Sequence, residues 1–336
     1  MHEGELLMRV DFELSVCYML RDFPKFDLRV QGKRPEEFMS AKLNLVFALM
    51  ATLMATMFAI SPFGQPAFGQ AGAPLPQDKT VVVLGQTLHY WDVGSGPIMV
   101  LVHGLGSKKE NDWGRAVGPL SQKYHVIALD QLGFGQSDKP VIDYNIQTYV
   151  DFLNEFLHEL KIEKATLVGE SLGGWISALY TLEASTDKHM VPVERLVLVD
   201  AAGLQQEKPI PDLNPSTLAA QRKVLEMVFY NSSWVTDDLV KKDLAERIHS
   251  NISYTVHSIL SNPALASERL DGKLGGIHVP TLVIWGKQDA LLPIASGERY
   301  SKEIAGAKFV TVDQCGHVPP VEKTAEFVAA VEDFAK

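Results

Sequence analysis

Cysteine is scarce in this chain of 336 residues. Its two cysteines, Cys17 and Cys315, lie far apart in sequence. They match no metal-ligand spacing, and so low a cysteine content excludes a scaffold built on disulfides. Clusters of positive charge are missing as well, and the formal net charge is -10. We therefore do not expect a nucleic-acid-binding protein, because such proteins carry basic patches.

Long uncharged runs are equally rare, with one exception at residues 43–60 (LNLVFALMATLMATMFAI). Lys42 precedes this run, and an Ala/Gly-rich stretch follows Pro62. A basic start, an apolar middle and a small-residue exit predict a signal peptide at 39–73 and export to the periplasm or the medium. The alternative is a membrane anchor through 43–60, because about 18 apolar residues is near the lower limit for a spanning helix.

Residues 1–38 do not fit a signal peptide, which should begin near the N-terminus. They are charged and show no clear period, and Met39-Ser-Ala-Lys42 would make an ordinary start for the signal. Our hypothesis is that translation begins at Met39, so that residues 1–38 are a non-native or unstructured extension.

Residues 74–336 have the size and the apolar content of one globular domain, since 46% of the chain is hydrophobic. Short runs rich in β-branched residues alternate there with helical stretches. This alternation predicts an α/β fold, a mainly parallel eight-stranded sheet with helices on both faces. The expected strands are 81–84, 88–91, 98–103, 125–130, 166–168, 196–199, 281–285 and 309–312, and the expected helices on the sheet are 148–160, 172–182 and 324–334.

The alternation stops between about 204 and 275, where the sequence is rich in helical patterns. Helices are expected at 218–229, 237–249 and 254–260, which together predict a helical cap inserted into the sheet domain. Four residues could line an apolar pocket there, although this spacing is more typical of plain helix packing: Met227, Phe229, Tyr230 and Trp234.

The sharpest motif is Gly169-Glu170-Ser171-Leu172-Gly173, which fits G-x-S-x-G. It lies between an apolar strand and a helical run, the context of a nucleophilic serine on a strained strand-to-helix turn. The alternative is a glycine-rich turn that holds a serine by chance. We expect Ser171 to be a nucleophile, and an unassisted serine needs a base.

His317 is the favoured base among ten histidines, because it follows the last apolar strand at the carboxyl edge of the sheet. Asp289 follows the preceding strand and would orient the base, which gives the chain order Ser, Asp, His. Asp200 and Asp313 remain alternatives for this acid. Two backbone amides must bind an oxyanion.

The candidate for the first of these amides is that of Leu172, which directly follows the nucleophile. The second candidate is the amide of Leu105, in the loop after the strand at 98–103. The alternative for this loop is an ordinary glycine turn.

Five segments occur in the order seen in α/β-hydrolases, and the chain resembles that family from about residue 80 to the C-terminus. They are His103-Gly-Leu-Gly106, Asp130-Gln-Leu-Gly-Phe-Gly-Gln-Ser-Asp-Lys-Pro140, Gly169-Glu-Ser-Leu-Gly-Gly174, Trp285-Gly-Lys-Gln-Asp289 and Cys315-Gly-His317. The resemblance implies Ser171, Asp289 and His317 as the catalytic triad.

Three functions compete. The first is a carboxylic ester hydrolase that acts through an acyl-serine on a small-molecule substrate. The second is a carbon–carbon bond hydrolase resembling the meta-cleavage-product hydrolases, which often carry an aromatic residue where Val318 stands here. The third is a non-enzymatic member of the fold that binds a ligand. None of the three readings requires a cofactor or a metal.

Overall fold

The computed structural model describes residues 75–207 and 211–336, all within the unit Pro66–Lys336. The predicted N-terminal extension 1–38 and the signal or anchor segment 39–73 therefore lie outside the described residues. Among the helices that are described, none is long and apolar enough to cross a membrane.

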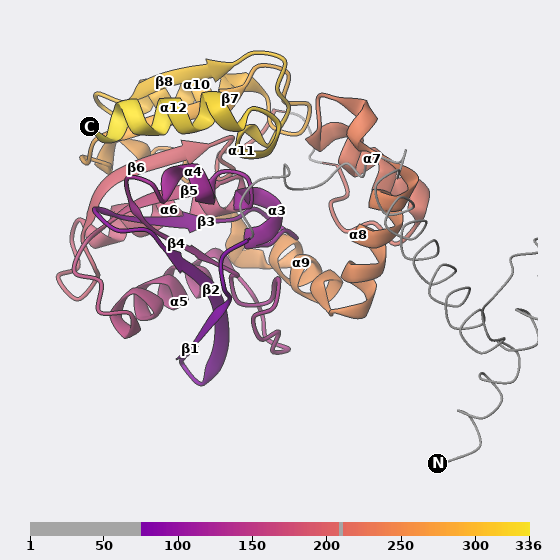
Figure 1. Cartoon of the computed structure of the whole chain (residues 1–336), viewed down its shortest axis with the longest axis horizontal. Coiled ribbons are helices and arrows are strands. Elements are labelled where there is room, and N and C mark those ends of the chain that lie inside the picture. Colours follow the sequence, from indigo (N-terminus) through magenta and orange to yellow (C-terminus); the bar gives the residue numbers. More distant parts are fainter. Residues whose placement is uncertain (1–74, 208–210) are drawn as a thin grey trace, which may run out of the picture. The chain divides into compact units, whose positions relative to one another are not determined.

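Eight strands form one sheet in the order β1-β2-β4-β3-β5-β6-β7-β8 (Figure 1). Strand β2 pairs antiparallel with both β1 and β4, and all other pairs are parallel. The predicted mainly parallel eight-stranded sheet is thus confirmed. The strands are β1 (Lys79–Val83), β2 (Gln86–Val93), β3 (Ile98–Val102), β4 (His125–Leu129), β5 (Ala165–Glu170), β6 (Val193–Val199), β7 (Thr281–Gly286) and β8 (Lys308–Val312).

Helices cover both faces of the sheet. Helices α5 (Ile146–Glu159), α6 (Leu172–Ala184) and α10 (Ile294–Glu303) share one apolar cluster with the strands. Helices α3 (Lys109–Trp113), α4 (Val117–Leu120) and α12 (Thr324–Ala335) share a second cluster. Burial on both faces explains why β5 and β7 are buried along their whole length.

Helix α5 shows how local sequence sets these elements. The Asn145 side chain accepts a hydrogen bond from the Thr148 N–H, and Thr148 Oγ1 accepts from the Asn145 N–H, which makes a capping box. Residues of its apolar face are buried against the sheet: Ile146, Tyr149, Val150, Leu153, Phe156 and Leu157.

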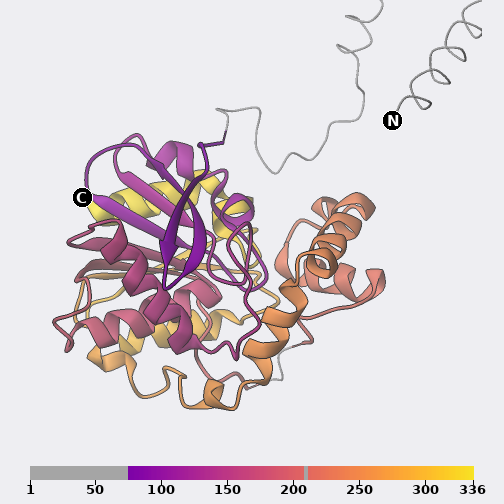
Figure 2. The ribbon, with the colours of Figure 1, turned by 90° about the horizontal axis from the view of Figure 1, so that it is seen from below.

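The residues between β6 and β7, about 204–275, are called the cap segment here. They hold α7 (Leu218–Val228), α8 (Asp237–His249) and α9 (Ile252–Ser261), with three short 3₁₀ turns. Figures 1 and 2 both show α7 and α8 to one side of the sheet. A third apolar cluster joins α7 and α8 to Val318 and Val321, which follow β8.

Four short or interrupted helices were not among the predicted elements: α3, α4, α10 and α11 (Pro319–Glu322). Helix α10 contains Gly297, an unfavourable helix residue. A Cβ at Gly297 would lie 2.6 Å from the Trp285 ring, so the glycine lets α10 pack closely on β7. Packing in the folded chain, rather than local propensity, decides this helix.

The start of α6 approaches β3 unusually closely. A Cβ at Gly173 would lie 2.1 Å from the Val102 carbonyl oxygen, and a Cβ at Gly169 would lie 2.2 Å from the Gly173 oxygen. Both neighbours are backbone atoms, which cannot rotate away. Only glycine therefore lets α6 begin where it does.

Gly173→Ala should destabilise the protein by about 1–3 kcal/mol, because the methyl group overpacks a rigid contact. Thermal or chemical unfolding measures this loss. Gly275→Ala is the matched control, since a Cβ there meets nothing within 4 Å. Equal stability of the two variants would contradict the tight contact between α6 and β3.

Candidate active site

The carboxyl ends of five neighbouring strands supply the site. Ser171 follows β5, Asp200 follows β6, Asp289 follows β7 and His317 follows β8, while Leu105 lies in the loop after β3. Parallel strands end at a common edge of the sheet, so residues far apart in sequence meet there.

Ser171 sits on a strained turn between β5 and α6. Its backbone has φ 49° and ψ -114°, a conformation that residues with a side chain rarely adopt. The turn is held because the Ser171 N–H donates to the Val199 oxygen, and the Ser171 oxygen accepts from the Ala202 N–H. These two hydrogen bonds hold the strained turn, so the Ser171 hydroxyl stays at the edge of the sheet.

His317 joins Ser171 to Asp289. His317 Nε2 lies 2.9 Å from Ser171 Oγ, and His317 Nδ1 lies 2.7 Å from Asp289 Oδ2. The other carboxylate oxygen of Asp289 accepts from the Leu291 and Leu292 N–H groups at 2.8 and 2.9 Å. The structure thus brings all three predicted triad residues together, in the geometry of a nucleophile, a base and an orienting acid.

The loop that carries His317 is tied to the cap segment. The His317 N–H donates to the Val228 oxygen at the end of α7, at 2.8 Å. The Glu322 carboxylate accepts from the N–H groups of Gly316, Tyr230 and Asn231. One direct hydrogen bond and the bridging Glu322 carboxylate therefore hold the His317 loop to the end of α7.

The two alternative acids have different places. Asp313 is exposed, accepts a hydrogen bond from Gln288 and lies 3.8 Å from the Lys287 ammonium, so it points away from His317. Asp200 is fully buried, and oxygens of Asp200 and Asp289 and a ring nitrogen of His317 all lie within 4.8 Å of one another. Asp289 makes the direct hydrogen bond to the imidazole.

Two other buried residues near the site, His103 and Cys315, have surroundings typical of structural residues. Buried His103 accepts from the Gln131 N–H through Nε2, so its Nδ1–H donates to the Gly104 oxygen. Cys315 is a free, buried thiol whose pKa is raised by burial, first of all, and then by nearby carboxylates. A raised thiol pKa disfavours the reactive thiolate.

The candidate oxyanion amides lie on either side of Ser171. Leu172 is the first residue of α6, where N–H groups have no partner within the helix. Leu105 precedes Gly106, which has φ 70°. Within residues 75–207 and 211–336, neither the Leu105 nor the Leu172 N–H has a hydrogen-bond acceptor. Both amides are therefore available to a ligand beside Ser171.

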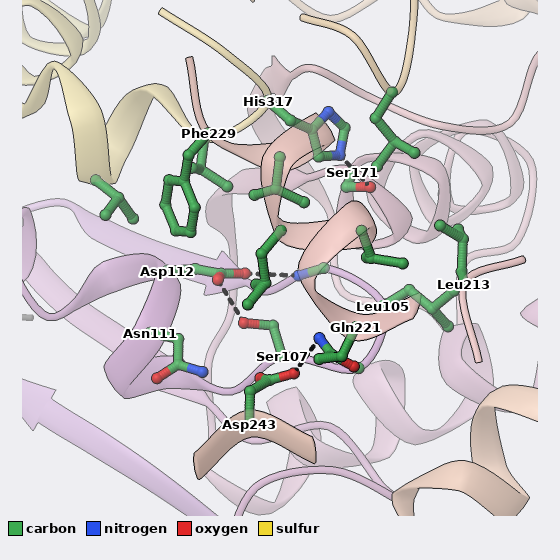
Figure 3. A pocket seen from close by; sticks show the side chains of 18 of the residues that line it. Leu105, Ser107, Asn111, Asp112, Ser171, Leu213, Gln221, Phe229, Asp243 and His317 are labelled. Carbon is green, nitrogen blue, oxygen red and sulfur yellow. Dashed lines mark hydrogen bonds between the residues drawn. The ribbon is translucent and has the colours of Figure 1, made fainter. Parts of the chain in front are cut away.

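A cavity of about 280 Å³ opens from Ser171 and His317 towards the cap segment. Figure 3 shows Ser171 and His317 on one side of it, with Gln221 and Asp243 from the cap segment on the other. Of the four cap residues considered for a pocket, Phe229 lines this cavity. Its cap-side wall comes from α7 and α8: Gln221, Val224, Leu225, Val228, Leu239, Lys242, Asp243, Glu246 and Arg247.

A second cavity of about 580 Å³ also reaches Ser171, on the side of Leu172 and Trp175. Both cavities are lined by Leu105 and Leu291. The nucleophile therefore stands between two spaces, each large enough to take one part of a small-molecule substrate.

An acidic pair beside the nucleophile was missed by the sequence reasoning. Glu170 is 2% exposed, and its Oε1 lies 3.5 Å from His317 Nε2. Its carboxyl group interacts with that of Asp112, which accepts a hydrogen bond from the Gly104 N–H. Burial, and then the charge of Asp112, hold the pKa of Glu170 well above its usual range. Burial therefore favours the uncharged form of Glu170.

The model of the alpha/beta hydrolase fold family matches residues 97–324, about two thirds of the chain. The chain belongs to the α/β-hydrolase family. The hydrolase is 29% identical to the 2-hydroxymuconate semialdehyde hydrolase of a Pseudomonas species, over 76% of this chain and 93% of that relative. It is 28% identical to the 2-hydroxy-6-oxo-2,4-heptadienoate hydrolase of Pseudomonas putida, over 76% and 95% of the two chains.

Solved structures agree with this family. A meta-cleavage product hydrolase from Pseudomonas fluorescens superimposes with a TM-score of 0.69 at 29% identity, covering 76% of this hydrolase and 97% of that chain. A bacterial membrane phospholipase A gives a TM-score of 0.67 at 26% identity, covering 89% and 95%.

Glu170→Gln should make the hydrolase more stable than the wild type as the pH rises above about 4.5. Glutamate in the unfolded chain ionises near pH 4.5, whereas the folded protein keeps the Glu170 proton to higher pH. The folded state then binds more protons, so its stability falls with pH by up to about 1.4 kcal/mol per unit. Glutamine has no such proton, and its amide can still donate to Asp112.

Urea unfolding at several pH values measures this difference. Glu163→Gln, at an exposed position, is the matched control and should follow the wild type. The two curves for Glu170→Gln and the wild type should meet below about pH 4.5. A constant difference between them at every pH would contradict the assignment of a buried, uncharged Glu170.

Proposed function

We propose that this protein is a serine hydrolase that cleaves a carbon–carbon bond next to a ketone, in a small acid of the 2-hydroxy-6-oxo-dienoate class. Two hydrogen bonds carry the catalytic part of this proposal: the Ser171 hydroxyl donates to His317 Nε2 at 2.9 Å, and His317 Nδ1–H donates to Asp289 at 2.7 Å. The printed activities of the two Pseudomonas relatives support the substrate class.

The residues suit an acyl-serine route. His317 Nε2 takes the Ser171 proton as Oγ attacks the ketone carbon, and the Leu105 and Leu172 amides bind the resulting oxyanion. When the carbon–carbon bond breaks, its electron pair passes into the conjugated acid, which takes the proton that His317 received from Ser171 and leaves His317 neutral. Water, deprotonated by His317, then attacks the acyl-serine and releases the second acid together with Ser171.

A carboxylate on the substrate would find a cation in the cavity. Arg247 is 7% exposed and lines the cavity. Its guanidinium lies against Gly106, where a Cβ would be 2.7 Å from Nη2, and its Nε donates to Asp243 at 3.1 Å. A buried, oriented guanidinium is suited to binding a carboxylate.

Ester hydrolysis is the second candidate. The membrane phospholipase A covers more of this chain than the meta-cleavage product hydrolase does. In addition, Val318 follows the base, where the carbon–carbon hydrolases often carry an aromatic residue. An acyl-serine serves both reactions, so the two differ in the leaving group and in the groups that bind it.

Ser171→Ala should lower kcat by roughly 10⁶-fold on either class of substrate, since the variant lacks the nucleophile. It should fold normally and should no longer react with a fluorophosphonate probe, which labels an activated serine without regard to substrate. Steady-state kinetics and intact-protein mass spectrometry provide the two readouts. Turnover by purified Ser171→Ala would overturn the proposed nucleophile.

Arg247→Gln should separate the two substrate classes. Loss of a charged hydrogen bond costs about 1.5–3 kcal/mol, so kcat/KM for 2-hydroxy-6-oxohepta-2,4-dienoate should fall by roughly 10–150-fold. Hydrolysis of p-nitrophenyl acetate, which has no carboxylate, should change little.

Lys242→Gln is the matched control, because Lys242 also lines the cavity but its side chain is 73% exposed. Wild-type protein that cleaves esters but not the dienoate would favour the second candidate. Equal losses on both substrates in Arg247→Gln would contradict a role in binding the carboxylate.

A further inference from the structure

The acid end of the triad contains two carboxyl groups instead of one. Asp200 directly follows β6, has a positive φ of 41° and is fully buried. Its Oδ1 accepts the Gly286 N–H at 2.9 Å. Its side chain interacts with that of Asp289, and an oxygen of each and a His317 ring nitrogen all lie within 4.8 Å of one another.

Two buried carboxyl groups in contact cannot both be charged, so they share one proton. Asp289 accepts three hydrogen bonds, from His317 and from the Leu291 and Leu292 amides. Among the described residues Asp200 accepts one, from Gly286, and no N–H or O–H donor reaches its Oδ2. Donors stabilise an anion, so Asp289 is the carboxylate and Asp200 holds the proton.

The titratable groups that face Asp200 come from three strand ends. They are Glu170 at the end of β5, Asp289 after β7, and Cys315 and His317 after β8. Burial, followed by the charge of Asp289, holds the pKa of Asp200 well above its usual range. With Asp289 removed, one of the causes of this raised pKa is gone.

We propose that Asp200 is a positioning residue of the triad: its carboxylic acid donates a hydrogen bond to Asp289, and its carboxylate replaces that of Asp289 beside His317 when Asp289 is lost. The proposal rests on the proposed serine-hydrolase function. Asp200 would thus be a second acid that can orient His317. Because it holds a proton, the pair of Asp200 and Asp289 carries a single negative charge.

The test is a double-mutant cycle of Asp200→Asn and Asp289→Ala. Asparagine at 200 keeps both hydrogen bonds, so Asp200→Asn alone should lower kcat by less than about tenfold. Asp289→Ala alone should lower kcat by roughly 10²-fold, because the Asp200 carboxylate then orients His317. In the double variant kcat should fall by roughly 10⁴-fold, as expected when no acid orients the base.

The pH dependence distinguishes this role from a merely structural one. In Asp289→Ala, kcat should depend on pH differently from kcat of the double variant, because only the single variant keeps a carboxyl group beside His317 that can ionise. Asp289→Asn should be less active than Asp289→Ala, because an amide at 289 donates to His317 Nδ1 and fixes the wrong tautomer. Exposed Asp313→Asn is the matched control and should behave as the wild type.

If Asp200→Asn lowers kcat by the same factor in the wild type and in Asp289→Ala, the proposal is overturned. Such a result would leave the serine-hydrolase function standing as long as the wild type reacts with the fluorophosphonate probe and Ser171→Ala does not. If Asp289→Ala fails to fold, Asp289→Ser replaces it in the cycle, because the serine oxygen can still accept from the Leu291 N–H.

Discussion

The close contact between the start of α6 and the backbone of β3 is the constraint on which the site depends. Because Gly173 lies against the Val102 carbonyl, α6 can begin at Leu172 directly after β5. Ser171 is thereby held in a strained turn, with its hydroxyl 2.9 Å from His317 and an amide on the helix side. The base, the acid and the cap segment are arranged around that fixed oxygen.

Much of this arrangement could be predicted from the sequence, because the sheet is built from apolar runs that are easy to recognise. Ser171, Asp289 and His317 each follow such a run, and strand ends gather at one edge. Short helices such as α3 and α11 could not be predicted, since they depend on packing. The signal-peptide prediction for 39–73 stays a prediction, and so does the start at Met39.

The polar surroundings of the triad could not be predicted for a different reason. Glu170 at the end of β5 meets Asp112 of helix α3, and Arg247 meets Gly106 across the boundary between cap segment and sheet. Such pairs have no fixed spacing in sequence. The alternatives Asp200 and Asp313 looked alike along the chain, yet the fold buries one against Asp289 and exposes the other. Burial gives otherwise similar carboxyl groups different chemistry.

The hydrogen bonds between the His317 loop and the end of α7 have a consequence for how the enzyme responds to its substrate. The His317 N–H is held by the Val228 oxygen, while Glu322 holds both the loop and the residues after α7. A displacement of α7 would therefore also displace the backbone that carries the imidazole. The position of α7 and the alignment of the imidazole are therefore linked, so the fit of a ligand against α7 and the placement of the base depend on the same hydrogen bonds.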